Sequence, residues 1–439
     1  MTFGPEMATL FAFGLLFGLT IAGVPLAFAT FGTAIVVGFT MFGPQSTIII
    51  VSRIFDNATN YTLITVPLFI IMGVLLERSG VAKSLFGVMH LWTARLPGGM
   101  AVSVVLAGSL MAAMVGVVGA EIITLGLVAL PTMLRRGYDK RLSAGVVVAA
   151  GSLGAMIPPS LVLIFYALIA NVSIAELYAA ALLPGLLLAV LYAIYIIIRC
   201  WIDPTLAPPP PREELKLPFL RKVLLAKDLV LPLLVIFCVL GSLYFGVASP
   251  TESAALGVAG ALLVTGLSRG LRLSELREVV LTSGRAIGPV MWIFFGATSF
   301  VGVYTFTGGI TYLSNLIAGL PLPPWGILIV MQIILILLGL PLDWVGIALL
   351  TMPVFVPVIK QLGYDPLWFG VLFCINMQIG YLSPPFGPSS FYLKSVAPPE
   401  VSLRDILISV WPFMGLQVLG LIIVMIFPQI ALWLPSLMR

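Results

Sequence analysis

The sequence predicts an all-α polytopic membrane protein built from two inverted-topology repeats. Composition, the placement of basic residues and a repeated Pro-Pro pair lead to this prediction. Of the 439 residues, 60% are hydrophobic and only 9% are charged, with a mean hydropathy of +1.16. A soluble domain carries about 25% charged residues. Many uncharged runs in this chain reach the ~20 residues that cross a bilayer core.

Each half is expected to contain five spans and one re-entrant helical hairpin. In the first half, the spans are predicted at roughly 7–28, 29–42, 62–76, 142–170 and 177–199, with the hairpin at about 98–134. In the second half, they are predicted at roughly 229–247, 253–268, 286–306, 367–393 and 406–432, with the hairpin at about 324–358. An odd number of crossings inverts the second repeat relative to the first. The predicted repeats are 1–198 and 229–439, joined by a polar cytoplasmic linker at 199–228.

Basic residues fix the predicted orientation. With the N-terminus outside, the segments facing the cytoplasm are 77–97, 135–141, 199–228, 269–285 and 394–405. They hold 19 of the 22 Lys and Arg residues, and only Arg53, Lys360 and Arg439 fall outside. The positive-inside rule therefore predicts that both termini lie outside. Nucleic acid is not an expected partner, because the basic residues do not cluster on a soluble face.

A duplication accounts for the two Pro-Pro pairs. Pro158-Pro159 and Pro384-Pro385 are 226 positions apart, and Gly-Tyr-Asp recurs at 137–139 and 363–365 with the same offset. Each pair interrupts an uncharged run that is longer than a straight spanning helix. Unwound backbone survives in a membrane only inside protein or against a wet cavity, where its carbonyls can bind cations. The paired breaks predict an ion and substrate site, and the alternative is two simple proline kinks.

Each hairpin tip combines glycine with one carboxylate. The first hairpin turns near GVVGAE at 116–121, and the second turns near GLPLD at 339–343. Glycine lets backbone approach a ligand closely, and charges such as Glu121 and Asp343 are rare at this depth. A binding role and a role as a hydrogen-bonded cap both fit these two side chains. Glu252 is expected to be structural, in a helix start capped by Ser249 or Thr251.

Catalytic and metal-ligating patterns are missing from the sequence. The chain has one His and three scattered Cys without CxxC spacing. No nucleophile, base and orienting group recur on one face. An enzyme is therefore not expected, and neither is a resident cofactor.

Three stretches resemble the large membrane subunit of tripartite ATP-independent periplasmic (TRAP) transporters. They are GSLGAMIPPSLVLIFYALIANVSIAELYAAALLPGLL, ASPTESAALGVAGALL and LPLDWVGIALLTMPVFVPVIKQLGYDPLWFGVLFCINMQIGYLSPPFGPSSFYLKSVAP. The resemblance covers nearly the whole chain. The second half looks most like the branch labelled mannitol/chloroaromatic, whose relatives also handle 2-oxo acids.

This resemblance implies sodium-driven import of a small organic acid across the bacterial inner membrane. In such a membrane, the orientation predicted from the basic residues places both termini in the periplasm. It implies two partners, a soluble periplasmic binding protein and a small four-span membrane subunit. The small subunit is expected to be a separate chain, because no four-span block precedes Met7. It also implies an elevator, in which hairpins and broken helices form a transport domain that moves against a scaffold. The alternative is a stand-alone ion-coupled carboxylate carrier that needs no binding protein.

The resemblance also implies sodium sites where the hairpin tips meet the broken helices. Na+ is then the coupling ion, and no other cofactor is expected. The first site would use Gly116, Gly119, Gly154 and Ser160. The second would use Gly339, Asp343, Gly380, Ser383 and Gly387. Many family members carry hydroxyl residues at the first tip, whereas GVVGAE leaves mainly carbonyls. The substrate pocket is expected at Glu121, Pro158, Pro159, Pro384 and Pro385.

Overall fold

The computed structural model describes residues 4–116, 118–209, 224, 226–270, 272–340, 342–384 and 387–438. All regular structure in these ranges is helical. Eight helical segments of this described part are long and apolar enough to cross a membrane. The prediction of an all-α polytopic membrane protein is therefore confirmed. Pro385 and most of the predicted linker (210–223 and 225) lie outside the described residues, so the division into 1–198, 199–228 and 229–439 stays a prediction.

The helices of the two halves correspond at an offset close to 226. The clearest pair is α7 (Val118–Arg135) and α18 (Trp344–Gln361), whose two bounds both differ by 226 positions. The recurring Gly-Tyr-Asp triplet follows each of these helices. Gly137 and Gly363 both take a left-handed φ of +78°, which ends the helix. The following aspartates, Asp139 and Asp365, cap the next helices through their side chains.

The other helices follow the same correspondence. The pairs are α1 (Pro5–Ile21) with α13 (Val230–Tyr244), α2 (Leu26–Phe42) with α14 (Pro250–Arg269), α5 (Val81–Thr93) with α16 (Gly309–Ala318), α6 (Gly99–Val115) with α17 (Pro324–Leu338), α8 (Lys140–Ser152) with α19 (Pro366–Leu382), and α9 (Leu161–Ala170) with α20 (Pro388–Val396). Two helices, α3 (Ser46–Ala58) and α4 (Thr65–Arg78), together match the single helix α15 (Leu273–Phe306). The long helix α10 (Ile174–Ile202) matches α21 (Leu403–Ser409) and α22 (Trp411–Ile426), which α23 (Gln429–Ser436) follows.

The structure corrects several predicted spans. Spans 7–28 and 29–42 meet at a turn over 22–25 rather than at 28, because Gly23 takes a φ of +86° and Pro25 precedes α2. The span predicted at 286–306 is the second part of a 34-residue helix, α15. The run 406–432 contains α22 and parts of α21 and α23 rather than one helix. Proline at 412 and 428 begins or precedes new helices there.

Three helices were absent from the sequence prediction. Helix α3 carries Arg53, Asp56 and Asn57, so its composition resembles a polar loop. Helices α5 and α16 are short and amphipathic, and each begins after a left-handed glycine, Gly80 or Gly308. Apolar run length identifies spans but not surface or connecting helices, whose stability comes from one packed face.

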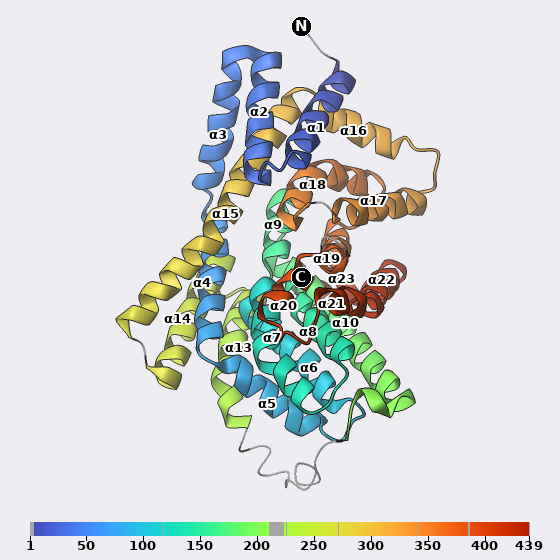
Figure 1. Cartoon of the computed structure of the whole chain (residues 1–439). Helices are drawn as coiled ribbons and strands as arrows, with labels where there is room; N and C mark the ends of the chain where they lie inside the picture. Colours follow the sequence, from blue (N-terminus) through green and yellow to red (C-terminus); the bar gives the residue numbers. More distant parts are fainter. Residues whose placement is uncertain are drawn as a thin grey trace.

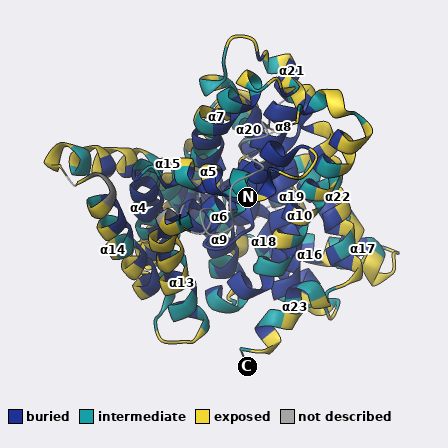
Figure 2. Cartoon of the chain, turned by 90° about the horizontal axis from the view of Figure 1, so that it is seen from below, coloured by how far each residue is buried: buried dark blue, intermediate teal, exposed yellow. Residues whose placement is uncertain are grey.

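The helices form two groups. We call α1–α4 and α13–α15 the arm group, and α6–α10 and α17–α23 the core group. In the arm group, α15 packs along α2 and α3, and α4 packs along α14. In both views, α4 and α13–α15 lie to one side of the core group (Figures 1 and 2). Helices α5 and α16 pack against core-group helices, and α16 also contacts α1 and α15.

Burial is greatest in the broken helices of the core group, while outer helices of both groups expose large apolar side chains. The residues Leu142–Ser152 of α8 and Leu367–Gly380 of α19 are buried, and Figure 2 shows the buried residues concentrated in the middle of the molecule. Arm-group helices expose large apolar side chains, with Leu267 of α14 73% exposed and Trp292 of α15 59% exposed. Such faces suit contact with lipid or with another membrane subunit.

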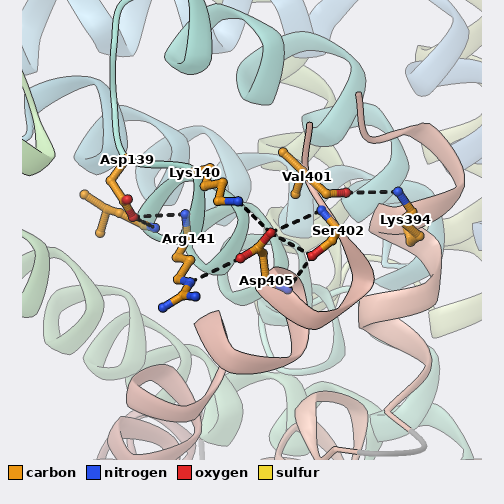
Figure 3. Close-up of polar contacts among 8 residues, drawn as sticks. Asp139, Lys140, Arg141, Lys394, Val401, Ser402 and Asp405 are labelled. Carbon is orange, nitrogen blue, oxygen red and sulfur yellow. Dashed lines mark hydrogen bonds and ion pairs between the residues drawn. The ribbon is translucent and has the colours of Figure 1, made fainter. Parts of the chain in front are cut away.

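Lys140, Arg141 and Asp405 join the two repeats at one end of the core group (Figure 3). Lys140 Nζ lies 2.9 Å from Asp405 Oδ2, and Arg141 Nε donates to Asp405 Oδ1 at 3.2 Å. Asp405 also belongs to the capping box that starts α21 with Ser402. Lys394 Nζ donates to the carbonyl of Val401 at 2.9 Å. The predicted cytoplasmic segments 135–141 and 394–405 are therefore neighbours.

The other predicted cytoplasmic segments join the same end of the molecule. Arg78 forms an ion pair with Glu278, which connects 77–97 to 269–285. The Asp139 amide donates to the carbonyl of Leu206 at 2.9 Å, which connects 135–141 to 199–228. A cavity lined by both Arg95 and Trp201 links 77–97 to 199–228. Contacts thus connect all five basic segments, as they must if these segments share one membrane face.

Replacing Asp405 with Ala should destabilise the core group. Two cations lose their partner and α21 loses its capping box, which together cost about 1–2 kcal/mol. Thermal unfolding of the purified protein in detergent measures this effect as a lower melting temperature. Asp56→Ala is the matched control, because Asp56 is exposed and its side chain contacts Ser52 only at 3.5 Å. Equal melting temperatures for the two variants would show that the ion pairs are dispensable.

Candidate ion and substrate site

The first Pro-Pro pair splits its helix inside the protein. Helix α8 ends at Ser152, a short 3-10 turn follows, and α9 begins at Leu161. All residues from 151 to 160 are buried. The Ser160 hydroxyl donates to the carbonyl of Ala155 at 2.6 Å, across the break. The unwound backbone is therefore enclosed by protein, as the membrane environment requires.

The tip of the first hairpin packs directly on this break. Gly116 ends α6 with a φ of +64°, and a Cβ at this position would collide with the carbonyl oxygen of Pro159. A Cβ on Gly154 would collide with the carboxyl group of Glu121. The predicted residues Gly116, Gly154, Pro158, Pro159, Ser160 and Glu121 therefore lie in one buried region. A side chain other than glycine's would separate the hairpin from the break.

Gly119 does not join this region. A Cβ on Gly119 would lie 3.1 Å from the ring of Tyr392, which belongs to α20. The first hairpin thus reaches the second broken helix at this point. The sequence offered no sign of this contact, because it joins residues of opposite repeats.

Glu121 is the most unusual polar group of the first region. Its side chain is fully buried, and neither carboxylate oxygen has a hydrogen-bond partner of ordinary geometry among the described residues. Backbone groups of Gly116 and Gly154 are its polar neighbours. A buried, unpaired carboxylate is costly unless a cation or a proton neutralises it. The sequence left two roles for this side chain, a cap of the hairpin turn and a binding group, and both stay predictions beside the backbone of Gly116 and Gly154.

The second break gathers carbonyl oxygens around Gly387. Helix α19 ends at Leu382 and α20 begins at Pro388. The Gly387 amide donates to the carbonyl of Ser383 at 2.7 Å, and a Cβ on Gly387 would lie 2.7 Å from the carbonyl oxygen of Tyr381. The Ser383 hydroxyl donates to the carbonyl of Ile379 at 2.7 Å. Pro384 is half-buried in this turn.

The tip of the second hairpin meets α19 through two glycines. A Cβ on either Gly339 or Gly380 would lie 3.2 Å from the Cα atom of the other. Beside this contact, a cavity of about 20 Å³ has room for one particle the size of water. It is lined by Gly339, Leu342, Asp343, Trp344, Ile347, Met377, Gly380, Tyr381 and Pro388. The structure thus brings Gly339, Asp343 and Gly380 together, with Ser383 and Gly387 in the adjoining turn.

Asp343 has a structural role as well as a position in this cavity. It is the N-cap of α18, and its carboxylate accepts from the Val345 amide at 3.3 Å. The side chain is solvent-accessible, although protein surrounds it on most sides. The cap predicted as an alternative is therefore present, and it leaves carboxylate oxygen available to the cavity. Glu252 forms the expected capping box with Ser249 and is structural.

Each hairpin contacts both broken helices. Helix α7 of the first hairpin packs against α8 and α20, while α18 of the second packs against α19 and α9. The Tyr166 hydroxyl of α9 donates to the carbonyl of Pro366 in α19 at 2.6 Å. The two candidate sites therefore belong to one packed unit.

Sequence reasoning missed several polar groups near the second break. Neither the amide oxygen nor the amide nitrogen of buried Gln378 has a partner among the described residues, and the same holds for the hydroxyls of Ser389 and Ser390. Asn376 of α19 donates to Gln332 of α17. The available signal was the presence of polar residues, INMQ and GPSS, in and after an otherwise apolar run. Unpaired buried groups of this kind call for a water or an ion.

Comparison with known proteins gives a consistent assignment. Residues 13–430 match the family model described as the tripartite ATP-independent periplasmic transporter, DctM component. The C4-dicarboxylate TRAP transporter large permease protein DctM of Pseudomonas aeruginosa is 33% identical over 401 residues, which cover 90% of this chain and 91% of that protein. The ectoine TRAP transporter large permease protein TeaC of Halomonas elongata is 28% identical and covers 96% of this chain and 97% of its own length.

A solved structure shares the fold. The YdaH transporter of Alcanivorax borkumensis superimposes with a TM-score of 0.63, over 88% of this chain and 89% of that one. Its sequence identity is 15%, so this likeness concerns the arrangement of helices alone.

Gly116→Ala should destabilise the protein more than a left-handed glycine does elsewhere. Alanine in the left-handed region costs about 1–2 kcal/mol, and at this position its Cβ would also collide with the Pro159 carbonyl. Gly246→Ala is the matched control, because Gly246 has a φ of +67° and open space around its Cβ position. Thermal unfolding of both variants isolates the contact between hairpin and break. If both melt at the same temperature, the tip does not depend on close approach to the break.

Proposed function

Because the chain belongs to the tripartite ATP-independent periplasmic transporter family, as its DctM component, we propose that it uses a sodium gradient to import a small organic acid. As the large permease subunit, it is a multi-pass protein of the inner membrane and a transporter rather than an enzyme. The family works with a small membrane subunit and a substrate-binding protein, which are the partners proposed here. The arm group would be the scaffold and the core group the moving transport domain of an elevator.

The cavity beside Asp343 carries the proposal. It offers one carboxylate and the close approach of backbone at Gly339 and Gly380, in a volume that suits one small ligand. Hard cations such as Na+ favour carboxylate and carbonyl oxygen. Ser383 and Gly387 extend this second site through the carbonyl oxygens of the adjoining turn. The first site would use Gly116, Gly154 and Ser160, without Gly119, which contacts Tyr392 of the other repeat.

The proposed substrate class is based on the solutes for which similar permeases are named. Relatives are named for C4-dicarboxylates, ectoine and isethionate, all small and polar. We propose a small carboxylate for this chain, bound near the Pro-Pro breaks at Pro158, Pro159, Pro384 and Pro385. Glu121 is enclosed beside Gly154, so we propose that it acts on the first cation site rather than on the substrate directly.

The coupling is energetically sufficient. One charge moving down a membrane potential of 100 mV releases about 2.3 kcal/mol. Two sodium ions carried with a monocarboxylate move one net positive charge inward. The electrical free energy released by this charge, together with the free energy of the sodium concentration gradient, is enough to concentrate the acid many-fold.

Uptake by the reconstituted three-component transporter should require sodium. With choline in place of sodium, uptake of the acid carried by the cognate binding protein should fall to background. Sodium-independent uptake would rule out the proposed coupling. Uptake by this chain without the binding protein would favour the stand-alone carrier.

Asp343→Asn refines this test. Asparagine keeps the N-cap acceptor for Val345 but removes the charge. Because unit charges 4 Å apart attract by about 4 kcal/mol at an effective dielectric constant of about 20, the sodium concentration for half-maximal uptake should rise about tenfold or more. Asp365→Asn is the control, since Asp365 also caps a helix but does not line the cavity. Equal losses of uptake and abundance in both variants would assign Asp343 a structural role only.

Both termini are proposed to lie in the periplasm, since the five connected basic segments would face the cytoplasm. Alkaline phosphatase fused to the C-terminus should be active, and green fluorescent protein fused there should be dark. When fused after Arg136 instead, alkaline phosphatase should be inactive and green fluorescent protein should be fluorescent. A fluorescent C-terminal fusion would overturn this orientation.

A further inference from the structure

A second cavity, of about 320 Å³, lies between the arm group and the core group. Its arm-group wall comes from α3, α15 and the 3-10 turn between α3 and α4, and its core-group wall comes from α9 and α18. None of the described residues of the two Pro-Pro breaks lines it. The cavity is thus distinct from the candidate cation sites.

Arg53 is the charged side chain of this cavity. Its stem lies on α15, where a Cβ on Gly302 would come within 2.7 Å of the Arg53 Cγ atom. Within the described part of the chain, the guanidinium forms no ion pair. Asp56, one turn along α3, is directed to Ser52 at 3.5 Å instead. An exposed guanidinium without an ion-pair partner among the described residues therefore lines this cavity.

The neighbouring polar groups suit an anion. The Asn60 side-chain oxygen accepts from the Thr62 amide at 2.9 Å, which leaves the Asn60 amide nitrogen as a donor. The Asn57 side chain is anchored by donation to the Arg53 carbonyl at 2.6 Å. A guanidinium binds a carboxylate through two parallel hydrogen bonds, so Arg53 with Asn60 offers three donors and one positive charge.

Aromatic residues separate this cavity from the one at Asp343. Phe294 lines the Arg53 cavity and meets Phe165 edge-on at a centroid distance of 5.2 Å. Phe165 in turn meets Trp344 at 5.5 Å, and Trp344 lines the cavity at Asp343. On α18, Leu349 faces the first cavity and Ile347 the second. The two cavities are thus neighbours across one helix and one aromatic layer.

We propose that Arg53 and Asn60 form an anion site that receives the substrate carboxylate on the arm-group side, before it reaches the second break. The inference rests on the proposed function, since it concerns the same substrate. The opposite charges of Arg53 and Asp343 set the order in which the carboxylate and the cation bind. A carboxylate next to Arg53 is stabilised without any cation, whereas one next to Asp343 is repelled until a cation occupies that cavity. Binding at Arg53 is therefore independent of sodium, and the later step is not.

The electrostatic part of the proposal is testable without transport. Asn57→Cys places a thiol in the cavity, in a Cys238→Ser background that removes the exposed native cysteine. The probes are the anionic and cationic methanethiosulfonate reagents of similar size, with an ethylsulfonate and an ethyltrimethylammonium group. A local positive charge should raise the relative rate of the anionic reagent about tenfold. Arg53→Gln should abolish this preference.

Two controls accompany the labelling. Lys360→Gln removes another basic residue that does not line the cavity, and it should leave the rate ratio unchanged. Thr298→Cys is a second reporter, on α15 rather than α3, and it should show the same dependence on Arg53. A ratio that Arg53→Gln does not alter at either reporter overturns the anion site.

Uptake supplies the second readout. Arg53→Gln should raise the KM for the anionic substrate about tenfold, because a hydrogen bond to a charged group contributes about 1.5–3 kcal/mol. The half-maximal sodium concentration should not change. Arg53→Lys keeps the charge but not the two-pronged geometry, and its KM should lie between those of Arg53→Gln and the unmodified protein.

The two proposals fail in different ways. Loss of the labelling preference in Arg53→Gln, together with sodium-independent uptake, would keep the anion site and remove sodium coupling. Sodium-dependent uptake with an unchanged KM in Arg53→Gln would remove the anion site and keep the coupling.

Discussion

The structure depends on one constraint, which is that peptide groups released from a helix inside a bilayer must find partners in the protein. Two Pro-Pro pairs release such groups, one in each half of the chain. The chain meets the constraint by packing a hairpin tip on each break, so that Gly116 lies on the Pro159 carbonyl and Gly339 lies on Gly380. Close approach needs glycine on at least one side, because a single Cβ at these contacts would separate hairpin from helix. Each break therefore depends on a hairpin tip that covers its unwound backbone.

The same constraint explains how two repeats become one functional unit. Each hairpin covers the break of its own repeat and also packs on the broken helix of the other repeat. Outside the bilayer core, Asp405 adds a link by pairing with Lys140 and Arg141 of the first repeat. These contacts tie the core group together, which is what the proposed elevator motion would require of a moving domain. The exposed apolar side chains of α14 and α15 lie on the group that would stay in place.

The sequence predicts the features that follow from local chemistry. Proline, glycine and the Gly-Tyr-Asp triplet each act on neighbouring backbone, so their spacing revealed the breaks, the helix ends and the duplication. The features that were missed depend on tertiary contacts. Helix α3 is held by packing on α2 and α15 in spite of its polar residues, and Gly119 meets Tyr392 from the opposite repeat. Arg53 was recognised only as a basic residue outside the cytoplasmic segments, because a cavity shared by two helix groups leaves no pattern in one stretch of chain.

The duplication repeats the backbone but not the charges, and this difference separates the two candidate sites. Glu121 lies in the first turn of α7, and its counterpart at an offset of 226 is Ile347; Asp343 precedes α18 as its cap. Asp343 reaches an accessible cavity, whereas Glu121 is sealed between Gly154 and the hairpin. A ligand of the proposed second site would therefore lie next to an exposed carboxylate, whereas one at the proposed first site would lie next to an enclosed carboxylate. If both proposed sites bind sodium, their different access implies an order of filling, while the direction of transport follows from the ion and substrate gradients.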